Sequence, residues 1–249
     1  MLNLVRHGVP TDRPALLIAH GLFGSARNWG VVAKRLAEDR EVVVVDMRNH
    51  GDSFHAPEHG YEDMAADLAR VIEAEGAPVD VMGHSMGGKA AMVLALTRPE
   101  LVRRLVVLDI APVAYGHSQR PQIEAMRRVD VGSVASRKEA EAQMGADPAV
   151  APFLLQSLDL AGRKWKLNLD ALEAQMDAVV GFPEVHGRFA KPALFLSGAL
   201  SDYVRPEHRE RVVALFPNAR FAQVEGAGHW LHADRPREVE AAVREFLDS

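Results

Sequence analysis

The sequence predicts an α/β fold built on a mostly parallel sheet, and three observations lead to this prediction. Short apolar runs alternate with longer helical patterns along most of the chain, as in proteins whose helices cover both faces of a parallel sheet. The runs are nearly continuous in Val, Leu and Ile, which is typical of strands buried on both faces. The 249 residues, 48% of them hydrophobic, suffice for one large domain with an insertion.

Six strands and five core helices are expected from these patterns. The strands are Ala15–Ala19, Val42–Val45, Val79–Met82, Leu105–Leu108, Ala193–Leu196 and Arg220–Val224. The helices are Trp29–Glu38, Tyr61–Glu75, Lys89–Thr97, Glu207–Leu215 and a closing helix near Arg237–Leu247. Pro78 and Pro99 mark the ends of two helical segments, because proline does not fit the interior of a helix.

The alternation breaks between about Pro112 and Lys191. This stretch contains helical patterns at Gln122–Val129, Arg137–Gln143 and Asp170–Val179, but no convincing strand. Its length favours a helical cap, or lid, over the carboxyl edge of the sheet rather than two additional core helices. The predicted organisation is therefore a core of residues 1–111 and 191–249 with a helical cap of residues 112–190.

Composition excludes several classes of function. The chain has no cysteine, which removes disulfides, thiolate metal sites and a cysteine nucleophile. The net charge of −5 is opposite in sign to the excess of positive charge expected of a protein that binds nucleic acid or an anionic membrane. The opening residues lack a signal-peptide apolar segment, and no apolar run reaches the length needed to span a membrane. A soluble, cytoplasmic protein without nucleic-acid partners or membrane insertion is expected.

The segment Gly83-His84-Ser85-Met86-Gly87 matches the pattern G-x-S-x-G. It directly follows a predicted strand and opens a predicted helix, which is the setting of a nucleophile elbow. Side chains at positions 83 and 87 would collide with the neighbouring backbone, and the strained turn would expose the Ser85 hydroxyl. Ser85 is therefore the candidate nucleophile. An ordinary glycine-rich turn is the alternative.

A serine nucleophile needs a base, because its hydroxyl is almost fully protonated at neutral pH. His229 follows the last predicted strand in the segment EGAGHWLHADRP and is the favoured base, with His232 as its rival. His84 is expected to be structural. His55 and His59 are separated by a helix-breaking proline and have no matching carboxylates, so no metal site is expected.

The oxyanion of an acyl-transfer reaction needs hydrogen-bond donors as well. The segment His20-Gly21-Leu22-Phe23-Gly24 follows the first predicted strand, where a backbone N–H can converge with that of Met86. The backbone N–H groups of Leu22 and Met86 are the predicted donors, with Phe23 in reserve.

These motifs together resemble the α/β-hydrolase fold superfamily. The segments that carry the resemblance are HGLFGS (20–25), DMRNHGDS (46–53), GHSMGGKAAM (83–92), LDIAPVAY (108–115) and GAGHW (226–230). Within the superfamily the chain is most similar to small bacterial carboxylesterases of the YbfF type, which implies activity on acyl esters and acyl thioesters. Acyl transfer to water through a serine, a histidine and a carboxylate needs no metal or organic cofactor, so none is expected.

Two carboxylates compete for the role of triad acid. Asp202 follows the strand after the cap, but it lies one residue beyond the position that a G-x-x-D pattern counted from Gly198 would give. Asp109 ends the strand after the elbow helix, at the edge where an open α/β sheet collects functional groups. The resemblance implies an acid at this earlier strand and a serine, here Ser201, at the later one. We favour Asp109, with Asp202 as the fallback acid and Ser201 as an auxiliary hydrogen-bonding residue.

The expected function is a serine carboxylesterase acting on small or medium acyl esters, including thioesters, through an acyl-enzyme. A perhydrolase, a carbon–carbon bond hydrolase and a catalytically slow ligand-binding protein of the same fold are the alternatives. Aromatic and apolar residues expected beneath the cap would line the acyl pocket: Phe23, Met86, Phe153, Trp165, Phe182 and Trp230.

Overall fold

The protein is built around one twisted seven-stranded sheet, in a computed structural model that describes all 249 residues. The strand order is β1-β3-β2-β4-β5-β8-β9, and every neighbouring pair is parallel except β1 and β3. The strands are β1 (Asn3–His7), β2 (Leu16–Ala19), β3 (Val42–Asp46), β4 (Val79–His84), β5 (Val102–Leu108), β8 (Ala193–Gly198) and β9 (Ala219–Val224). The mostly parallel sheet that the sequence predicts is thus confirmed.

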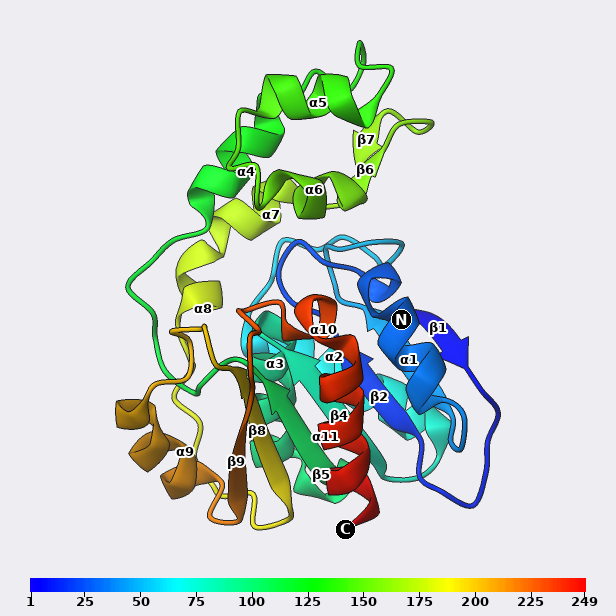
Figure 1. Cartoon of the computed structure of the whole chain (residues 1–249), viewed down its shortest axis with the longest axis vertical. Coiled ribbons are helices and arrows are strands. Elements are labelled where there is room, and N and C mark those ends of the chain that lie inside the picture. The colour runs from blue at the N-terminus through cyan, green and yellow to red at the C-terminus, as the bar shows by residue number, and fades with distance from the viewer.

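Helices cover both faces of the sheet (Figure 1). Leu16 and Ile18 of β2 belong to the apolar cluster on the face of α1 (Gly30–Leu36) and α11 (Pro236–Asp248). Leu17 and Ala19 belong to the opposite cluster, with α2 (Tyr61–Glu75), α3 (Met86–Thr97) and α9 (Arg209–Leu215). Because successive side chains of a strand point to opposite faces, a strand with two buried faces is apolar throughout.

Strand β1 was not among the predicted elements. It pairs antiparallel with β3 at the edge of the sheet, and its side chains are only half-buried or exposed. Val5 and Arg6 both face solvent to a large degree. An edge strand of this kind carries no continuous apolar run, which is the signal that identified the other six strands.

The segment predicted to be the cap lies in the chain between β5 and β8, two strands that are neighbours in the sheet. Its helices lie beyond the carboxyl ends of the parallel strands (Figure 1). They are α4 (Arg120–Arg127), α5 (Arg137–Met144), α6 (Ala151–Leu154), α7 (Leu169–Ala174) and α8 (Met176–Val180). The predicted helix Asp170–Val179 is divided into α7 and α8. The expectation of no strand here was wrong, because β6 (Leu158–Asp159) and β7 (Lys164–Trp165) form a hairpin, though one too short to leave a sequence pattern.

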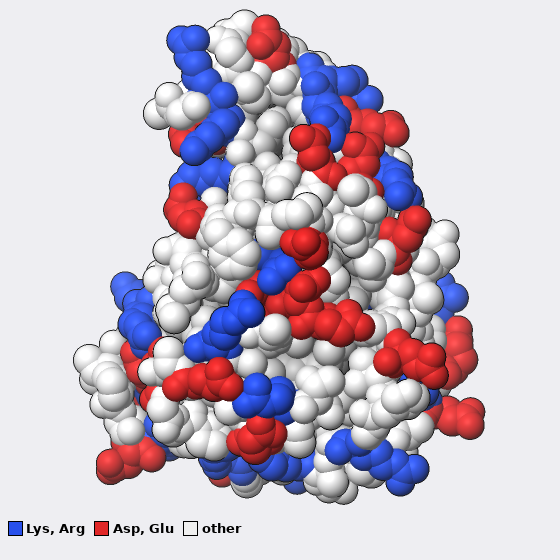
Figure 2. Space-filling model, turned by 180° about the vertical axis from the view of Figure 1, so that it is seen from behind, with Lys and Arg blue, Asp and Glu red and all other residues white.

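Several short elements connect these layers. They are the 3₁₀ turns η1 (Ala26–Trp29), η2 (Pro99–Leu101), η3 (Leu155–Ser157) and η4 (Pro206–His208), and the one-turn helix α10 (Leu231–Asp234). On the face that Figure 2 shows, positive and negative side chains are interspersed. No helix combines the length and the apolar character that crossing a membrane requires.

Candidate active site

Ser85 lies in a sharp turn between β4 and α3, with the positive φ of 51° that a nucleophile elbow requires. The backbone around it is packed too closely for side chains. A Cβ added to Gly83 would lie 2.3 Å from the carbonyl oxygen of Gly87, and one added to Gly87 would lie 2.4 Å from that of Ala19. The two glycines of the motif are therefore required by close backbone approach. The tight turn leaves the Ser85 side chain partly exposed to a cavity.

His229 connects Ser85 to Asp109. Its Nε2 lies 3.1 Å from Ser85 Oγ, and its Nδ1 lies 2.7 Å from Asp109 Oδ2. With a proton on Nδ1, the imidazole donates to the carboxylate, and Nε2 accepts the hydrogen bond of the serine hydroxyl. The three side chains come from loops after β4, β5 and β9, which meet because the carboxyl ends of parallel strands share one edge of the sheet.

Asp109 is fully buried and held by two further donors. Its Oδ1 accepts from the backbone N–H of Gly198 at 3.0 Å, and its Oδ2 accepts from Ser201 Oγ at 2.5 Å. The structure does not bring Asp202 to the imidazole. Asp202 is exposed, and the only hydrogen bond it makes is through its carbonyl oxygen, to Arg205.

Two other histidines lie beside His229 without bonding to Ser85: His84, which was expected to be structural, and His232, the rival base. His84 Nε2 donates to the backbone carbonyl of His229 at 2.8 Å. His232 stacks on Trp29 with ring centroids 4.2 Å apart. Burial lowers the pKa of His84 well below its ordinary value and that of His232 to about 3. Both rings are therefore neutral at pH 7.

Tyr203 is a part of the site that sequence reasoning missed. Its ring stacks on the imidazole of His229 at a centroid distance of 3.9 Å and an interplanar angle of 18°. Tyr115 helps to hold Tyr203 in place, because the Tyr115 hydroxyl donates to the Tyr203 carbonyl oxygen at 2.7 Å. This stack restricts the tilt of the base ring, leaving it aligned with Ser85 and Asp109.

Leu22 and Met86 both border the cavity beside Ser85, and the backbone N–H of neither residue donates to an acceptor within the protein. Met86 is the first residue of α3, where N–H groups are free and the helix dipole is positive. The reserve donor, Phe23, is already engaged, because its N–H donates to His50 Nε2 at 3.1 Å. The geometry therefore favours the first two donors.

The loop that carries Leu22 is fixed from two sides. His50 receives the N–H of Phe23 and itself donates through Nδ1 to the Arg48 carbonyl oxygen at 2.9 Å. On the opposite side, Ser157 of the cap donates to the Phe23 carbonyl oxygen at 2.9 Å. The sequence did not predict these roles, although His50 belongs to the segment DMRNHGDS (46–53), one of those that carry the family resemblance.

A cavity of about 290 Å³ opens at Ser85 between the core and the cap. Of the six residues predicted to line an acyl pocket, Phe23, Met86, Phe153 and Trp230 border it. The prediction is corrected for Trp165 and Phe182, which lie outside it. The Trp165 indole N–H donates to the Met126 carbonyl oxygen within the cap, and Phe182 packs beside Tyr61 with ring centroids 6.5 Å apart.

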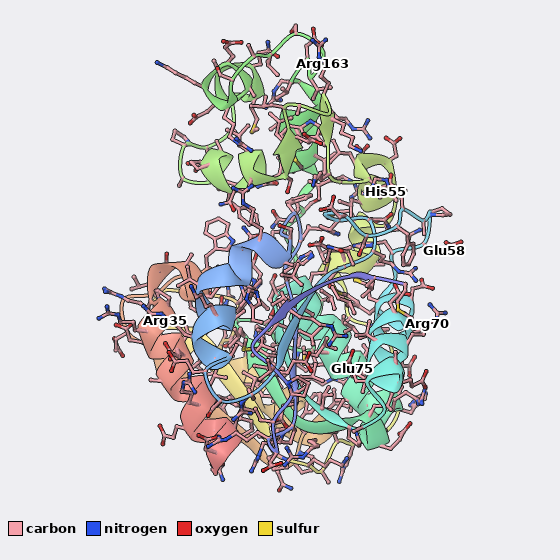
Figure 3. The ribbon with its side chains drawn as sticks, turned by 90° about the vertical axis from the view of Figure 1, so that its right-hand side faces the viewer. Arg35, His55, Glu58, Arg70, Glu75 and Arg163 are labelled. Atoms are coloured by element: carbon pink, nitrogen blue, oxygen red, sulfur yellow. The ribbon has the colours of Figure 1, made fainter.

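The two histidines around Pro57 do not converge on a common point. His55 is exposed on the loop between β3 and α2, near the labelled Glu58 in Figure 3. His59 is buried, where burial lowers its pKa to about 3 and its Nε2 lies 3.4 Å from Met86 Sδ. No group of three or more histidine and carboxylate side chains is arranged to hold a metal ion.

Comparison with known proteins gives consistent matches over most of the chain. Residues 14–236 match the model of the alpha/beta hydrolase fold family. The chain is 42% identical to the mouse (Mus musculus) sn-1-specific diacylglycerol lipase ABHD11, over 94% of this chain and 81% of the relative. It is 37% identical to the Escherichia coli (strain K12) esterase YbfF, over 94% and 92% respectively. A solved marine microorganism esterase superimposes with a TM-score of 0.93 at 35% identity, covering 98% of both chains.

Proposed function

The chain belongs to the α/β-hydrolase fold family and is a serine hydrolase of the ester-hydrolysing type, and we propose that it acts through a triad of Ser85, His229 and Asp109. The observation that carries the assignment is the single imidazole hydrogen-bonded to both the Ser85 hydroxyl and the Asp109 carboxylate. Asp202 makes no hydrogen bond to the imidazole and is not part of the proposed triad.

In the acylation step, His229 Nε2 takes the proton of Ser85 as Oγ attacks the ester carbonyl carbon. Asp109 stabilises the imidazolium that forms and holds the Nδ1 tautomer. Ser201 and the Gly198 N–H donate to the carboxylate, so that its position is fixed before the substrate arrives. Neither group touches the reacting atoms, and both act as positioning groups.

The negative charge that develops on the carbonyl oxygen needs donors that are already in place. We assign this role to the backbone N–H groups of Leu22 and Met86, because both residues border the cavity and neither N–H has an acceptor in the protein. Each such donor contributes a factor of about 10²–10³ in rate. The N-terminal end of α3 adds positive potential at the same point.

Collapse of the tetrahedral intermediate expels the leaving alcohol, to which His229 gives back its proton. Water then attacks the acyl-enzyme by the same route, with His229 as base, and releases the acid and free Ser85. The bonds that break are the ester bond and one O–H bond of water. The reaction therefore requires no cofactor.

The cavity supports a small or medium acyl group as the substrate. A volume of about 290 Å³ lies at the lower end of the range for small-molecule sites. Its apolar wall includes Phe153 and Trp230, with ring centroids 5.5 Å apart. The relatives named as an esterase and a diacylglycerol lipase support an oxygen ester as the scissile group. A thioester is the second candidate that the same chemistry accommodates.

A fluorophosphonate probe and a panel of esters test the proposal together. Wild-type protein should be labelled covalently and should release acid from short-chain esters. The Ser85→Ala variant should do neither, while Ser133→Ala, which makes the same change at an exposed serine outside the cavity, should retain labelling. Labelling of the Ser85→Ala variant would exclude Ser85 as the nucleophile. Negligible turnover by labelled wild-type protein, with tight binding of an ester, would favour a ligand-binding role.

A further inference from the structure

Lys89 is a buried cation within the proposed acyl pocket. It lies one turn after Ser85 on α3, where its N–H donates to the Ser85 carbonyl oxygen at 3.0 Å, and it borders the same cavity. Its side chain is 1% exposed, although α3 is otherwise almost entirely apolar. A lysine is rarely buried to this degree unless it is paired, because removing an ammonium group from water is costly.

The protein surrounds this ammonium group with neutral partners only. Lys89 Nζ donates to the carbonyl oxygens of Val180, at 3.0 Å, and Gly181, at the end of cap helix α8. The rings of Tyr115 and Tyr61 lie 4.8 Å and 5.6 Å from Nζ. Carbonyl dipoles and aromatic faces stabilise a cation partially, but they supply no formal negative charge.

No carboxylate compensates the charge. Lys89 forms no ion pair within 4.0 Å, and burial alone lowers its pKa to about 7, with no neighbouring anion raising it. An ammonium group has three N–H donors, and the two carbonyl oxygens occupy two of them. One donor and the whole formal charge are therefore left without a partner at the wall of the cavity.

We propose that Lys89 is a specificity-determining residue that binds a carboxylate at the far end of the substrate's acyl chain. The preferred substrates are then half-esters of dicarboxylic acids, in which one carboxyl group is esterified and the other is free. The esterified end would lie at Ser85 and the free carboxylate would pair with the ammonium group one helical turn away. This inference rests on the proposed function, because it assumes an acyl group bound at Ser85.

The aliphatic wall and the buried ammonium then have complementary roles. Val179 and Val180 border the cavity beside Lys89 and can contact the methylene groups of such a chain. The free carboxylate would be recognised by a charge-assisted hydrogen bond, which is stronger than one between neutral groups. Removing that partner is expected to reduce kcat/KM by about 10- to 100-fold.

The test compares monoethyl esters of succinic, glutaric and adipic acid with ethyl esters in which an isopropyl group replaces the free carboxylate. Ethyl esters are used because more reactive leaving groups would be lost to attack by the neighbouring carboxylate. For at least one chain length, wild-type kcat/KM should be about 10- to 100-fold higher for the acid than for its neutral partner. Lys89→Met, which keeps the length and removes the charge, should abolish this ratio.

Lys191 provides a matched control. Its Nζ also donates to two backbone carbonyl oxygens, those of Pro99 and Val102, at 2.7 Å and 2.8 Å, but it does not border the cavity. Lys191→Met should reduce stability as Lys89→Met does and leave the acid-to-neutral ratio unchanged. A ratio that persists in Lys89→Met, or that disappears in Lys191→Met, would overturn the assignment.

The pH dependence gives a second measurement that needs no variant. As pH rises from 6 to 8, Lys89 should lose its proton, and the acid-to-neutral ratio of kcat/KM should fall. The other titratable groups that face Lys89 are Tyr61 and Tyr115, whose pKa values burial raises, and His117, whose pKa is lowered by burial and by the charges of His229 and Lys89. Protonation of His229 changes kcat/KM for both esters by the same factor, because both are hydrolysed through it, and so it does not alter their ratio.

The outcomes separate the two proposals. Wild-type protein that hydrolyses the neutral esters through Ser85 but shows no preference for any acid partner would exclude the Lys89 proposal and leave the esterase function standing. Absence of Ser85-dependent hydrolysis of both series would instead contradict the proposed function itself.

Discussion

Asp109 Oδ2 lies 2.7 Å from His229 Nδ1, although 120 residues separate the two in the sequence. The strained φ of 51° at Asp109 turns its side chain at the end of β5 toward this contact. The carboxylate is completely buried, so that its interaction with the imidazole is not weakened by solvent.

Asp109→Asn should reduce kcat by about 10³–10⁴-fold, because an amide no longer holds the required imidazole tautomer. Asp202→Asn is the matched control, since the same chemical change falls on an exposed side chain. It should leave kcat within about twofold of wild type. Steady-state hydrolysis of a short-chain ester measures both. The reverse ranking would transfer the role of acid to Asp202.

Ser201→Ala should lower kcat by a smaller factor, about 10-fold. The Ser201 hydroxyl donates to Asp109 Oδ2, the same oxygen that receives His229 Nδ1–H, and a hydrogen bond to a charged group contributes about 1.5–3 kcal/mol. Ser201→Thr keeps the hydroxyl and should recover most of the activity. Equal activity in the alanine and threonine variants would show that the hydroxyl does not contribute to the position of Asp109.

His50→Leu should reduce kcat by about 10-fold or more with little change in KM. The Phe23 N–H would lose its acceptor, and the adjoining Leu22 N–H, proposed to act in the transition state, would be less well held. His55→Leu changes an exposed histidine of the same loop and should have wild-type kinetics. A His50→Leu variant that is less stable but retains full kcat would limit His50 to a structural role.

The free energy of unfolding should fall as the pH decreases from 6.5 toward 3. Burial lowers the folded-state pKa of His232 to about 3, from an ordinary value of 6.5. In this window the unfolded chain therefore binds one more proton than the folded protein at this residue. The contribution is fully present above pH 6.5 and decreases by about 1.4 kcal/mol per pH unit below it.

His232→Phe should make this dependence shallower while preserving the ring stack on Trp29. Urea unfolding of both proteins at pH 7, 6 and 5 checks the prediction, because the difference between their unfolding free energies should change by about 0.7 kcal/mol from pH 7 to 6 and by about 1.2 kcal/mol from pH 6 to 5. If the unfolding free energies of the two proteins changed in parallel with pH, His232 would bind its proton as readily in the folded protein as in the unfolded chain, which would contradict the prediction.

The sequence was most informative where one physical requirement acts on every residue of a segment. Leu16–Ala19 could be predicted as a strand because its alternate residues enter two different apolar clusters, which makes the run apolar throughout. Asn3–His7 could not, because an edge strand with one solvated face has no such requirement. Similarly, G-x-S-x-G identified Ser85 because close backbone contacts exclude side chains at both glycine positions.

Contacts between residues that are far apart in the sequence could not be predicted from local sequence patterns. Trp165 and Trp230 are both aromatic residues near the cap, but only Trp230 borders the cavity, and composition does not distinguish them. The role of His50 depends on the loop after β3 packing beneath the loop after β2. Lys89 left a signal, a lysine within an apolar helix, but its meaning depends on the absence of a carboxylate around it.

The distribution of the site along the chain has a consequence for protein synthesis. Ser85 precedes His229 by 144 residues, and the Gly198 N–H that fixes Asp109 belongs to β8, after the cap. A ribosome therefore synthesises the proposed nucleophile long before the proposed base. Throughout that interval Ser85 lacks the imidazole proposed to activate it, and hydrolytic activity is expected only after β9 and the loop that carries His229 have been made.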